Sequence, residues 1–353
     1  MTDSVREFES HRSRLFGLAY RLLGSAADAE DVLQDAFLRW HGRDDVREPS
    51  AWLVRVVTNL CLNRLTSARA SRELYVGPWL PEPVFTGDGV LGPMETAEQR
   101  DSVSLALLVL MERLTPGERA VYVLREAFGY SHREVAEIVG YTEANCRQLH
   151  TRARRRLAAD PDRSGAPDSE QAGALLRRFL AAATEGNLAD LEELLADDVT
   201  SWADGGGRPG MARRPVLGRL QVSRYLVGSG ARFGAGISVG ISEINGVWAM
   251  TGWADVRMAD RAGPGRLPWA LPAAGRHETS SGHESSSGRE SAPRLRGAGE
   301  LDTGAVLVAV MVPEIAGGRI GALRIIGNPE KLAFAARQAV RMSRPTRVSG
   351  LDG

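Results

Sequence analysis

The chain has very little lysine and no excess of either charge. Among its 353 residues Lys331 is the only lysine, so nearly all the positive charge is carried by arginine. Basic and acidic residues number 44 each, and the formal net charge is zero. A general polyanion binder is therefore excluded. Any affinity for nucleic acid must come from local clusters such as residues 152–156.

Cysteine, signal-like segments and long apolar runs are also scarce. The two cysteines, Cys61 and Cys146, are too few for a disulfide framework and lack metal-ligand spacing. Both fall on predicted helices, where free thiols behave as small buried hydrophobes. The N-terminus has no basic-then-apolar leader, and no apolar run approaches membrane-spanning length. We expect a cytoplasmic, soluble protein that holds no metal and no cofactor.

The segment 131–157, SHREVAEIVGYTEANCRQLHTRARRRL, predicts a helix, a tight turn and a second helix. Gly140 suits the end of the first helix because glycine tolerates positive φ. Thr142 is a good N-cap for the second helix. The outer face of that helix carries groups suited to base edges and phosphates: Arg147, Gln148, His150, Thr151, Arg154 and Arg155. A DNA-binding helix-turn-helix is one reading, and an arginine-rich surface helix is the other.

Two helical domains are expected before residue 160. Residues 8–65 contain three apolar-faced helices, with Ser25 and Ser50 as caps and a polar loop at 42–49. From residue 67 to about 98 the helical periodicity disappears, and glycine and proline indicate a linker. Trp79 and Leu80 in this linker suggest that it docks. The second domain includes a helix capped by Thr115, with Pro116 in its first position.

Three strings, in their order and separation, resemble bacterial sigma factors of the extracytoplasmic-function group: DAEDVLQDAFLRW, AWLVRVVTNLCLNRL, and the segment from LTPGERAVYVLREAFGY through the helix-turn-helix. The resemblance covers residues 8–158. It implies that the first domain (region 2) binds the β′ clamp of core RNA polymerase and melts the −10 element of promoter DNA. The second (region 4) would bind the β flap and read the −35 element.

The resemblance also assigns residues, segment by segment. Asp28, Asp31 and Asp35 lie in the polymerase-binding helix, whose acidic face would complement a basic polymerase surface. The loop 42–49 lies where the family captures a flipped-out base. Contacts to the melted strand would be made by Arg55, Asn59, Asn63 and Arg64. Contacts to the −35 element would be made by Arg147, Gln148, His150 and Thr151.

A third domain is predicted after a polar hinge at residues 164–168. Amphipathic helices precede strands rich in β-branched residues, which is an α+β order, and we expect a curved antiparallel sheet. The opening FLAAATEGNLADLEELLADDV resembles the SnoaL-like cone fold. Residues 259–300 are too polar to form core, so we read them as a disordered insertion in a hairpin loop. His277 and His283 there lack a frame for metal binding.

Three short strings together resemble the sigma subgroup that carries a SnoaL-like extension. They are WLPEP, which begins Trp79-Leu80-Pro81; DGGGR, which is Asp204, Gly205, Gly206, Gly207 and Arg208; and NPEKL, which is Asn328, Pro329, Glu330, Lys331 and Leu332. The resemblance implies that the extension contacts the sigma half and regulates it in cis, without a separate anti-sigma protein. Packing of Trp79 within the sigma half alone stays an alternative.

The predicted fold class is multidomain, with two all-α sigma domains and a C-terminal α+β SnoaL-like cone fold. The expected boundaries are 1–70 for region 2, 71–97 for the linker, 98–160 for region 4 and 169–340 for the cone domain. The alternative function is an enzyme, or a ligand-sensing cone module, fused to a DNA-binding half. Asp204 is the only motif carboxylate placed to act as a base. Because it has no partner acid or histidine, we expect no catalysis, although a small ligand in the cone stays open.

Overall fold

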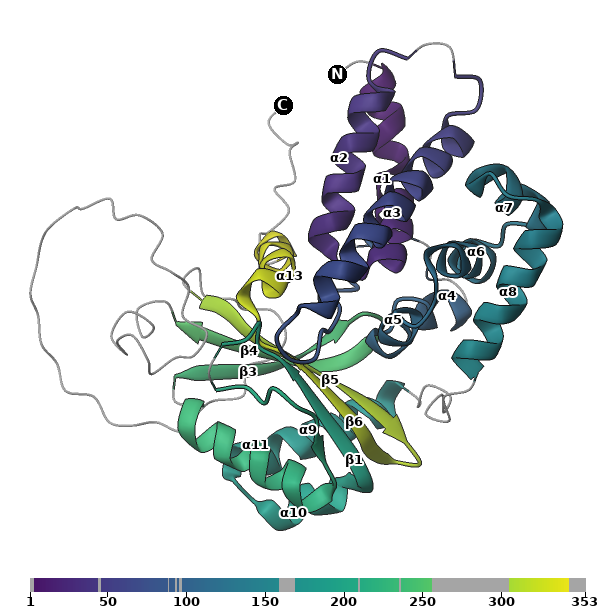
Figure 1. Cartoon of the computed structure of the whole chain (residues 1–353). Coiled ribbons are helices and arrows are strands. Elements are labelled where there is room, and N and C mark those ends of the chain that lie inside the picture. The colour runs from purple at the N-terminus through teal and green to yellow at the C-terminus, as the bar shows by residue number, and fades with distance from the viewer. Residues whose placement is uncertain are drawn as a thin grey trace, which may run out of the picture.

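The computed structural model describes residues 3–43, 46–87, 89–92, 94, 97–158, 169–208, 210–234, 236–255 and 305–342. Figure 1 shows the helices of the N-terminal half above a twisted sheet that belongs to the C-terminal half. The predicted insertion at 259–300, with His277 and His283, lies outside the described residues. Two residues of the predicted loop 42–49 also lie outside them.

The first helical domain consists of α1 (Asp3–Leu23), α2 (Ala26–Trp40) and α3 (Pro49–Glu73). Ser25 caps α2 as predicted, because its hydroxyl accepts a hydrogen bond from the Asp28 N–H at 3.0 Å. Helix α3 differs from the prediction at both ends. It begins at Pro49, one residue before the expected cap Ser50, since proline suits a first helical position. It then continues past the expected end of periodicity at residue 67.

The second helical domain consists of α4 (Ala97–Asp101), α5 (Leu105–Met111), α6 (Pro116–Glu126), α7 (His132–Val139) and α8 (Glu143–Ala158). Its caps follow from the sequence. Thr115 and Ser131 each form a capping box with the glutamate three residues on. Gly140 ends α7 with φ 74°, so α7 and α8 form the predicted helix-turn-helix.

The C-terminal domain contains α9 (Ser169–Glu185), α10 (Leu188–Leu194), β1 (Leu195–Asp204), β2 (Val216–Leu217) and α11 (Arg219–Phe233). Strands β3 (Ile237–Ile244), β4 (Val247–Asp255), β5 (Ala305–Ala316) and β6 (Arg319–Ile326) follow, and α13 (Pro329–Met342) ends the described chain. The sheet order is β2-β1-β6-β5-β4-β3. The expected antiparallel sheet is wrong at one place, because β1 pairs with β6 in parallel.

The sheet separates two packed layers (Figure 1). Helices α9, α10 and α11 cover one face and enclose an apolar cluster that includes Leu176, Phe179 and Leu323. Helix α13 packs on the other face, against β5, and also contacts α2. On that side a single apolar cluster runs from the sheet into both helical domains, and Leu307 and Phe334 belong to it together with Phe16 and Leu108. The three domains therefore share this cluster, in addition to the separate one under α9, α10 and α11.

The turns and the domain contacts determine how the sites lie. Strands β3 and β4 are joined by Asn245 and Gly246, whose φ values of 53° and 76° fit a two-residue hairpin turn. Strands β4 and β5 pair antiparallel, so the segment 256–304 connects hairpin partners. Helix α6 contacts α1 and α3, and α7 contacts α3, so the two helical domains pack directly on each other.

Candidate functional sites

Helix α8 presents the predicted DNA-reading residues on the outside of the molecule. The side chains of Arg147, Gln148, Thr151, Arg154 and Arg155 are exposed, while Cys146, Ala153 and Leu157 pack inward. The Arg147 guanidinium is 65% exposed and pairs with Glu143 one turn earlier, at 2.5 Å. This i,i+4 pair is weak at such exposure and can be exchanged for a phosphate or a base edge.

His150 lies differently from the other predicted readers. Its side chain is 12% exposed, and its Nε2 lies 2.6 Å from a carboxylate oxygen of Glu126 in α6. The His132 ring of α7 packs edge-on against it, with centroids 5.4 Å apart. His150 therefore connects α8 to α6 and α7, and the other five predicted DNA-contacting residues lie on the exposed face of α8.

The acidic face of α2 and the polar face of α3 meet at one arginine. Arg64 donates to the Asp28 carbonyl at 2.7 Å, lies 3.3 Å from an Asp35 carboxylate oxygen and 4.0 Å from one of Asp31. The acids predicted to bind polymerase and the residues predicted to support the melted strand are thus in contact through Arg64. Of the other α3 residues in that set, Arg55 and Asn63 are exposed and Asn59 is half-buried.

The strings WLPEP, DGGGR and NPEKL come together at Asp204, at the end of β1. The Asp204 side chain is fully buried. Its Oδ2 accepts hydrogen bonds from the Leu80 N–H at 2.8 Å and from Lys331 Nζ at 2.6 Å, and its Oδ1 accepts from the Tyr75 hydroxyl at 2.5 Å. Lys331 Nζ also donates to the Leu80 carbonyl at 2.5 Å. The acid and the amine of the C-terminal domain thus hold both main-chain groups of one linker residue.

Aromatic rings of the linker surround the same ammonium. Lys331 Nζ lies 4.2 Å from the Trp79 ring centroid and 4.7 Å from that of Tyr75. A desolvated cation over an aromatic face gains more than an exposed one. Trp79 also touches the first helical domain, because a Cβ added to Gly24 would lie 3.1 Å from its ring. The ring is therefore held between the helical half and the C-terminal domain.

The DGGGR and NPEKL strings fit each other through backbone geometry. Gly206 has φ 61°, and a Cβ there would lie 2.8 Å from the Asn328 side chain, so only glycine fits without displacement. Asn328 donates through Nδ2 to the Tyr75 hydroxyl at 3.0 Å and through its N–H to the Asp204 carbonyl at 3.0 Å. Pro329 begins α13 and Glu330 is exposed, whereas Leu332 is buried.

These contacts bear on Asp204 as a general base. A base must reach a substrate proton, but both Asp204 oxygens already accept hydrogen bonds from the protein and its side chain is inaccessible to solvent. In the described part of the chain, no group of three or more His, Cys, Asp or Glu side chains is arranged to hold a metal. The small ligand in the cone stays a prediction.

Glu82, the acid of WLPEP, caps helix α2, which is predicted to bind polymerase. Its carboxylate accepts from the Ala26 and Ala27 N–H groups at 2.9 and 3.0 Å and from the Ser25 hydroxyl at 2.8 Å. An acid at a helix N-terminus satisfies unpaired donors and complements the helix dipole. Burial nevertheless raises the pKa of Glu82, against these hydrogen bonds, which favour the ionised form. A linker side chain therefore provides the N-terminal cap of α2.

Glu82→Gln is expected to change how stability depends on pH. A carboxyl whose pKa is raised by folding contributes stability that is fully present below its ordinary pKa of 4.5 and is lost as pH rises through the folded value. The Tm of the native protein, relative to that of Glu82→Gln, should therefore fall as the pH rises from 4.5. Thermal unfolding over a series of pH values measures the difference. Glu330→Gln, at an exposed position, is the control. If the plots of Tm against pH for Glu82→Gln and the native protein were parallel, the expectation would be wrong.

The direct contact between the helical domains was not predicted from the sequence. The buried Arg21 of α1 donates to Ser102 Oγ at 2.7 Å, to the Leu91 carbonyl at 2.6 Å and to the Gln99 carbonyl at 3.3 Å. Burial lowers the pKa of Arg21 to about 10. Gly17, one turn earlier, lets residue 91 lie directly on the α1 backbone. The only available signal was an arginine within an apolar stripe.

An exposed, arginine-bearing helix-turn-helix, a second helical domain and an α+β domain fastened to the linker between them define a multidomain protein of the DNA-binding class. Comparison with known proteins refines this. A family model described as Sigma-70 region 2 matches residues 8–71, and one described as Sigma-70, region 4 matches residues 104–157. Across the described residues, no helix has both the length and the apolar character needed to cross a membrane.

The ECF RNA polymerase sigma factor SigJ of Mycobacterium tuberculosis is 42% identical over 235 residues, which cover 66% of this chain and 75% of SigJ. The probable ECF RNA polymerase sigma factor SigI of the same organism is 33% identical over 204 residues, covering 56% and 68% of the two chains. The crystal structure of SigJ matches with a TM-score of 0.64 and 31% identity, covering 94% of this chain and 98% of that one. The chain therefore belongs to the extracytoplasmic-function sigma factors, and its C-terminal extension is SnoaL-like.

Proposed function

We propose that the protein directs core RNA polymerase to specific promoters and that its C-terminal domain regulates this step in cis. In this proposal the C-terminal domain holds the two helical domains in a closed arrangement and takes the place of a separate anti-sigma protein. Polymerase binding would require the arrangement to open. The protein acts as a regulator of transcription and not as an enzyme.

One observation carries the proposal, namely the clamp that Asp204 and Lys331 form on the backbone of Leu80. Both clamp residues belong to the C-terminal domain, and the clamped residue belongs to the linker between the two helical domains. A linker held in this way cannot extend. Because the two domains would read separate promoter elements, they must separate on DNA, and clamping the linker opposes this.

The packing of α7 on α3 supports the same proposal. Helix α3 carries Arg55, Asn59 and Asn63, the residues proposed to support the melted strand, and α7 is the first helix of the helix-turn-helix. In the closed arrangement the two DNA-binding surfaces belong to one rigid block with a shared core. The acids Asp28, Asp31 and Asp35 would contact polymerase once the block opens.

Arg147→Ala is expected to relax selectivity at one base pair of the −35 element. Loss of a bidentate base contact costs about 1–3 kcal/mol, whereas loss of a phosphate contact weakens all sequences alike. Arg152→Ala, in the arginine run of the same helix, is the matched comparison. It should reduce the slope of log binding constant against log salt concentration by about one, the contribution of one phosphate contact. Transcription with core polymerase on promoters varied at each −35 position measures both. If neither the native protein nor the Lys331→Met variant gave any promoter-dependent transcript, the sigma function would be refuted.

A further inference from the structure

The turn between β3 and β4 is fully buried at Asn245, which is unusual for a hairpin loop. Loops run over the surface because their main-chain groups need water or specific partners. Asn245 nevertheless has no exposed surface. The turn therefore depends on partners from outside the C-terminal domain, and it finds them in both helical domains and in the linker.

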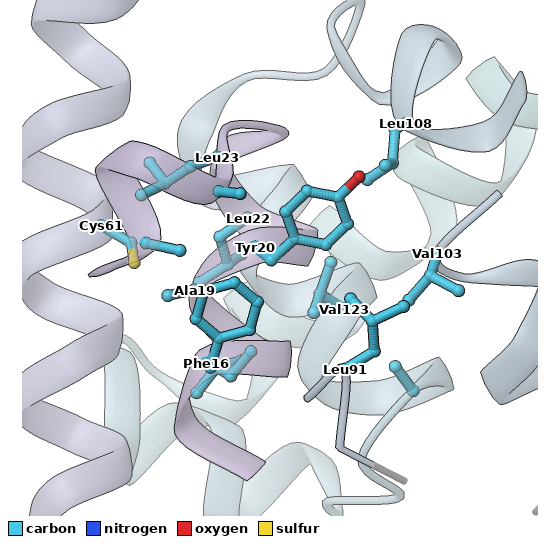
Figure 2. Packing of buried hydrophobic residues seen from close by; sticks show 14 of the residues in the cluster. Phe16, Ala19, Tyr20, Leu22, Leu23, Cys61, Leu91, Val103, Leu108 and Val123 are labelled. Carbon is cyan, nitrogen blue, oxygen red and sulfur yellow. The ribbon is translucent and has the colours of Figure 1, made fainter. Parts of the chain in front are cut away.

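The Asn245 side chain uses both of its functional groups for these partners. Its Oδ1 accepts from the Val84 N–H of the linker at 3.0 Å. Its Nδ2 donates to the Tyr20 hydroxyl of α1 at 2.6 Å and to the Val103 carbonyl, between α4 and α5, at 2.7 Å. One amide thus bonds to the first helical domain, the linker and the second helical domain. Figure 2 shows Tyr20 extending from α1 toward Leu108, with Val103 nearby.

The backbone of the turn extends the same connection. The Asn245 N–H donates to the Val84 carbonyl at 2.9 Å, and the Gly246 N–H donates to Thr86 Oγ1 at 2.8 Å. Phe85 forms a bridge with Ile244, and the Thr86 N–H donates to the Glu243 carbonyl at 3.1 Å. Linker residues 84–86 therefore add to β3 as a short antiparallel segment. At Gly246 a Cβ would lie 3.4 Å from the Arg100 carbonyl oxygen, so the second helical domain packs closely on the turn.

Tyr20 continues the network to the polymerase-binding helix. Its hydroxyl accepts from Asn245 and donates to the Glu82 carbonyl at 2.6 Å, and the Glu82 carboxylate caps α2. Each of these groups is buried. A buried polar network holds one geometry because every displaced member leaves an unsatisfied partner. Movement of either helical domain relative to the other must therefore withdraw the turn.

We propose that the Asn245–Gly246 turn is an autoinhibitory pin, which fixes the two helical domains against each other independently of the clamp at Leu80. This proposal rests on the proposed function, in which the closed arrangement opposes polymerase binding. The clamp holds the linker, whereas the pin holds the domains themselves. Opening then requires the β3–β4 turn to leave its position between Tyr20, Val84 and Val103.

Asn245→Gly tests the pin in the full-length protein. Glycine keeps the positive φ of the turn, so the variant removes the three side-chain hydrogen bonds without straining the hairpin. The matched control is Gly317→Asn in the exposed β5–β6 turn, which also has two residues with positive φ and nothing near them. Tyr20→Phe removes one partner hydroxyl and provides a second, milder variant if Asn245→Gly folds poorly.

The readout is the distance between spin labels at Leu38→Cys on α2 and Glu137→Cys on α7, both exposed, while the two native cysteines are buried. The native protein and Gly317→Asn should give one narrow distribution, and Asn245→Gly and Tyr20→Phe should add a longer, broader population. Affinity for core polymerase, measured with unlabelled protein, should rise about fivefold or more for Asn245→Gly. A narrow, unchanged distribution in both pin variants would overturn the pin. A broadened distribution with unchanged polymerase affinity would instead overturn the proposed cis regulation.

Discussion

Lys331→Met is expected to raise the apparent affinity of the full-length protein for core RNA polymerase by about tenfold or more. The variant removes the Lys331 ammonium, which in the native protein donates to the Leu80 carbonyl and balances the charge of Asp204. Removing one partner of a buried ion pair costs about 3–5 kcal/mol because the remaining charge stays buried. That cost falls on the closed arrangement, since Asp204 regains water when the linker leaves. Each 1.4 kcal/mol by which the closed arrangement is destabilised relative to the open one raises the open population about tenfold, until nearly all molecules are open.

Titration of fluorescently labelled core polymerase measures the affinity, and promoter-dependent transcription at limiting protein measures the consequence. Glu330→Gln is the matched control, because it changes the charge of the adjacent residue at an exposed position on the same helix. We expect its affinity to equal that of the native protein. If Lys331→Met bound core polymerase no more tightly, although the label distance across α2 and α7 had lengthened, the closed arrangement would not control polymerase binding.

Gly17→Ala is expected to push the linker at residue 91 away from α1 and to destabilise the closed protein without damaging α1 itself. In an isolated helix alanine is favoured over glycine by about 0.5–1 kcal/mol. In the closed protein, however, its Cβ would lie 2.0 Å from the Leu91 carbonyl oxygen and 2.6 Å from the carbonyl carbon. These are backbone atoms, so the segment 89–92 must move away from α1. Overpacking of this kind typically costs about 1–3 kcal/mol.

Gly228→Ala in α11 is the control for Gly17→Ala. It is also a helical glycine, but it is exposed and a Cβ there would meet nothing within 4 Å. Thermal unfolding followed by circular dichroism should show a lower Tm for Gly17→Ala, and an equal or higher Tm for Gly228→Ala, at unchanged helix content. A Tm for Gly17→Ala above that of the native protein would mean that α1 and residue 91 do not pack as described.

Local patterns predicted the helices well because caps and apolar spacing act within a few residues. Thr115 begins one helix and Gly140 ends another where the sequence places them. The mixed sheet could not be predicted in the same way, since β1 and β6 are separated by more than 100 residues and nothing in either strand specifies a parallel partner. The length of α3 was underestimated because its last turns carry no apolar stripe.

The candidate sites divide along the same line. The strings around Trp79, Asp204 and Lys331 could be singled out by resemblance, but their meeting at one buried carboxylate depends on the packing of three domains. Tyr75 and Gly17 carry no pattern of their own, because a tyrosine beside a linker and a glycine in a helix are both common. Asn245 was not singled out from the sequence, although Asn-Gly between apolar runs is a hairpin signal that could have located the turn.

Because Lys331 is the only lysine in the chain, its ammonium is also the only side-chain amine. An amine-acylating reagent therefore has one internal target in the whole protein. That target is 8% exposed and lies under the linker. Its rate of modification is the product of its intrinsic reactivity and the fraction of molecules in which the linker has left. The protein thus carries a natural chemical reporter of its own opening, which needs no label and no substitution.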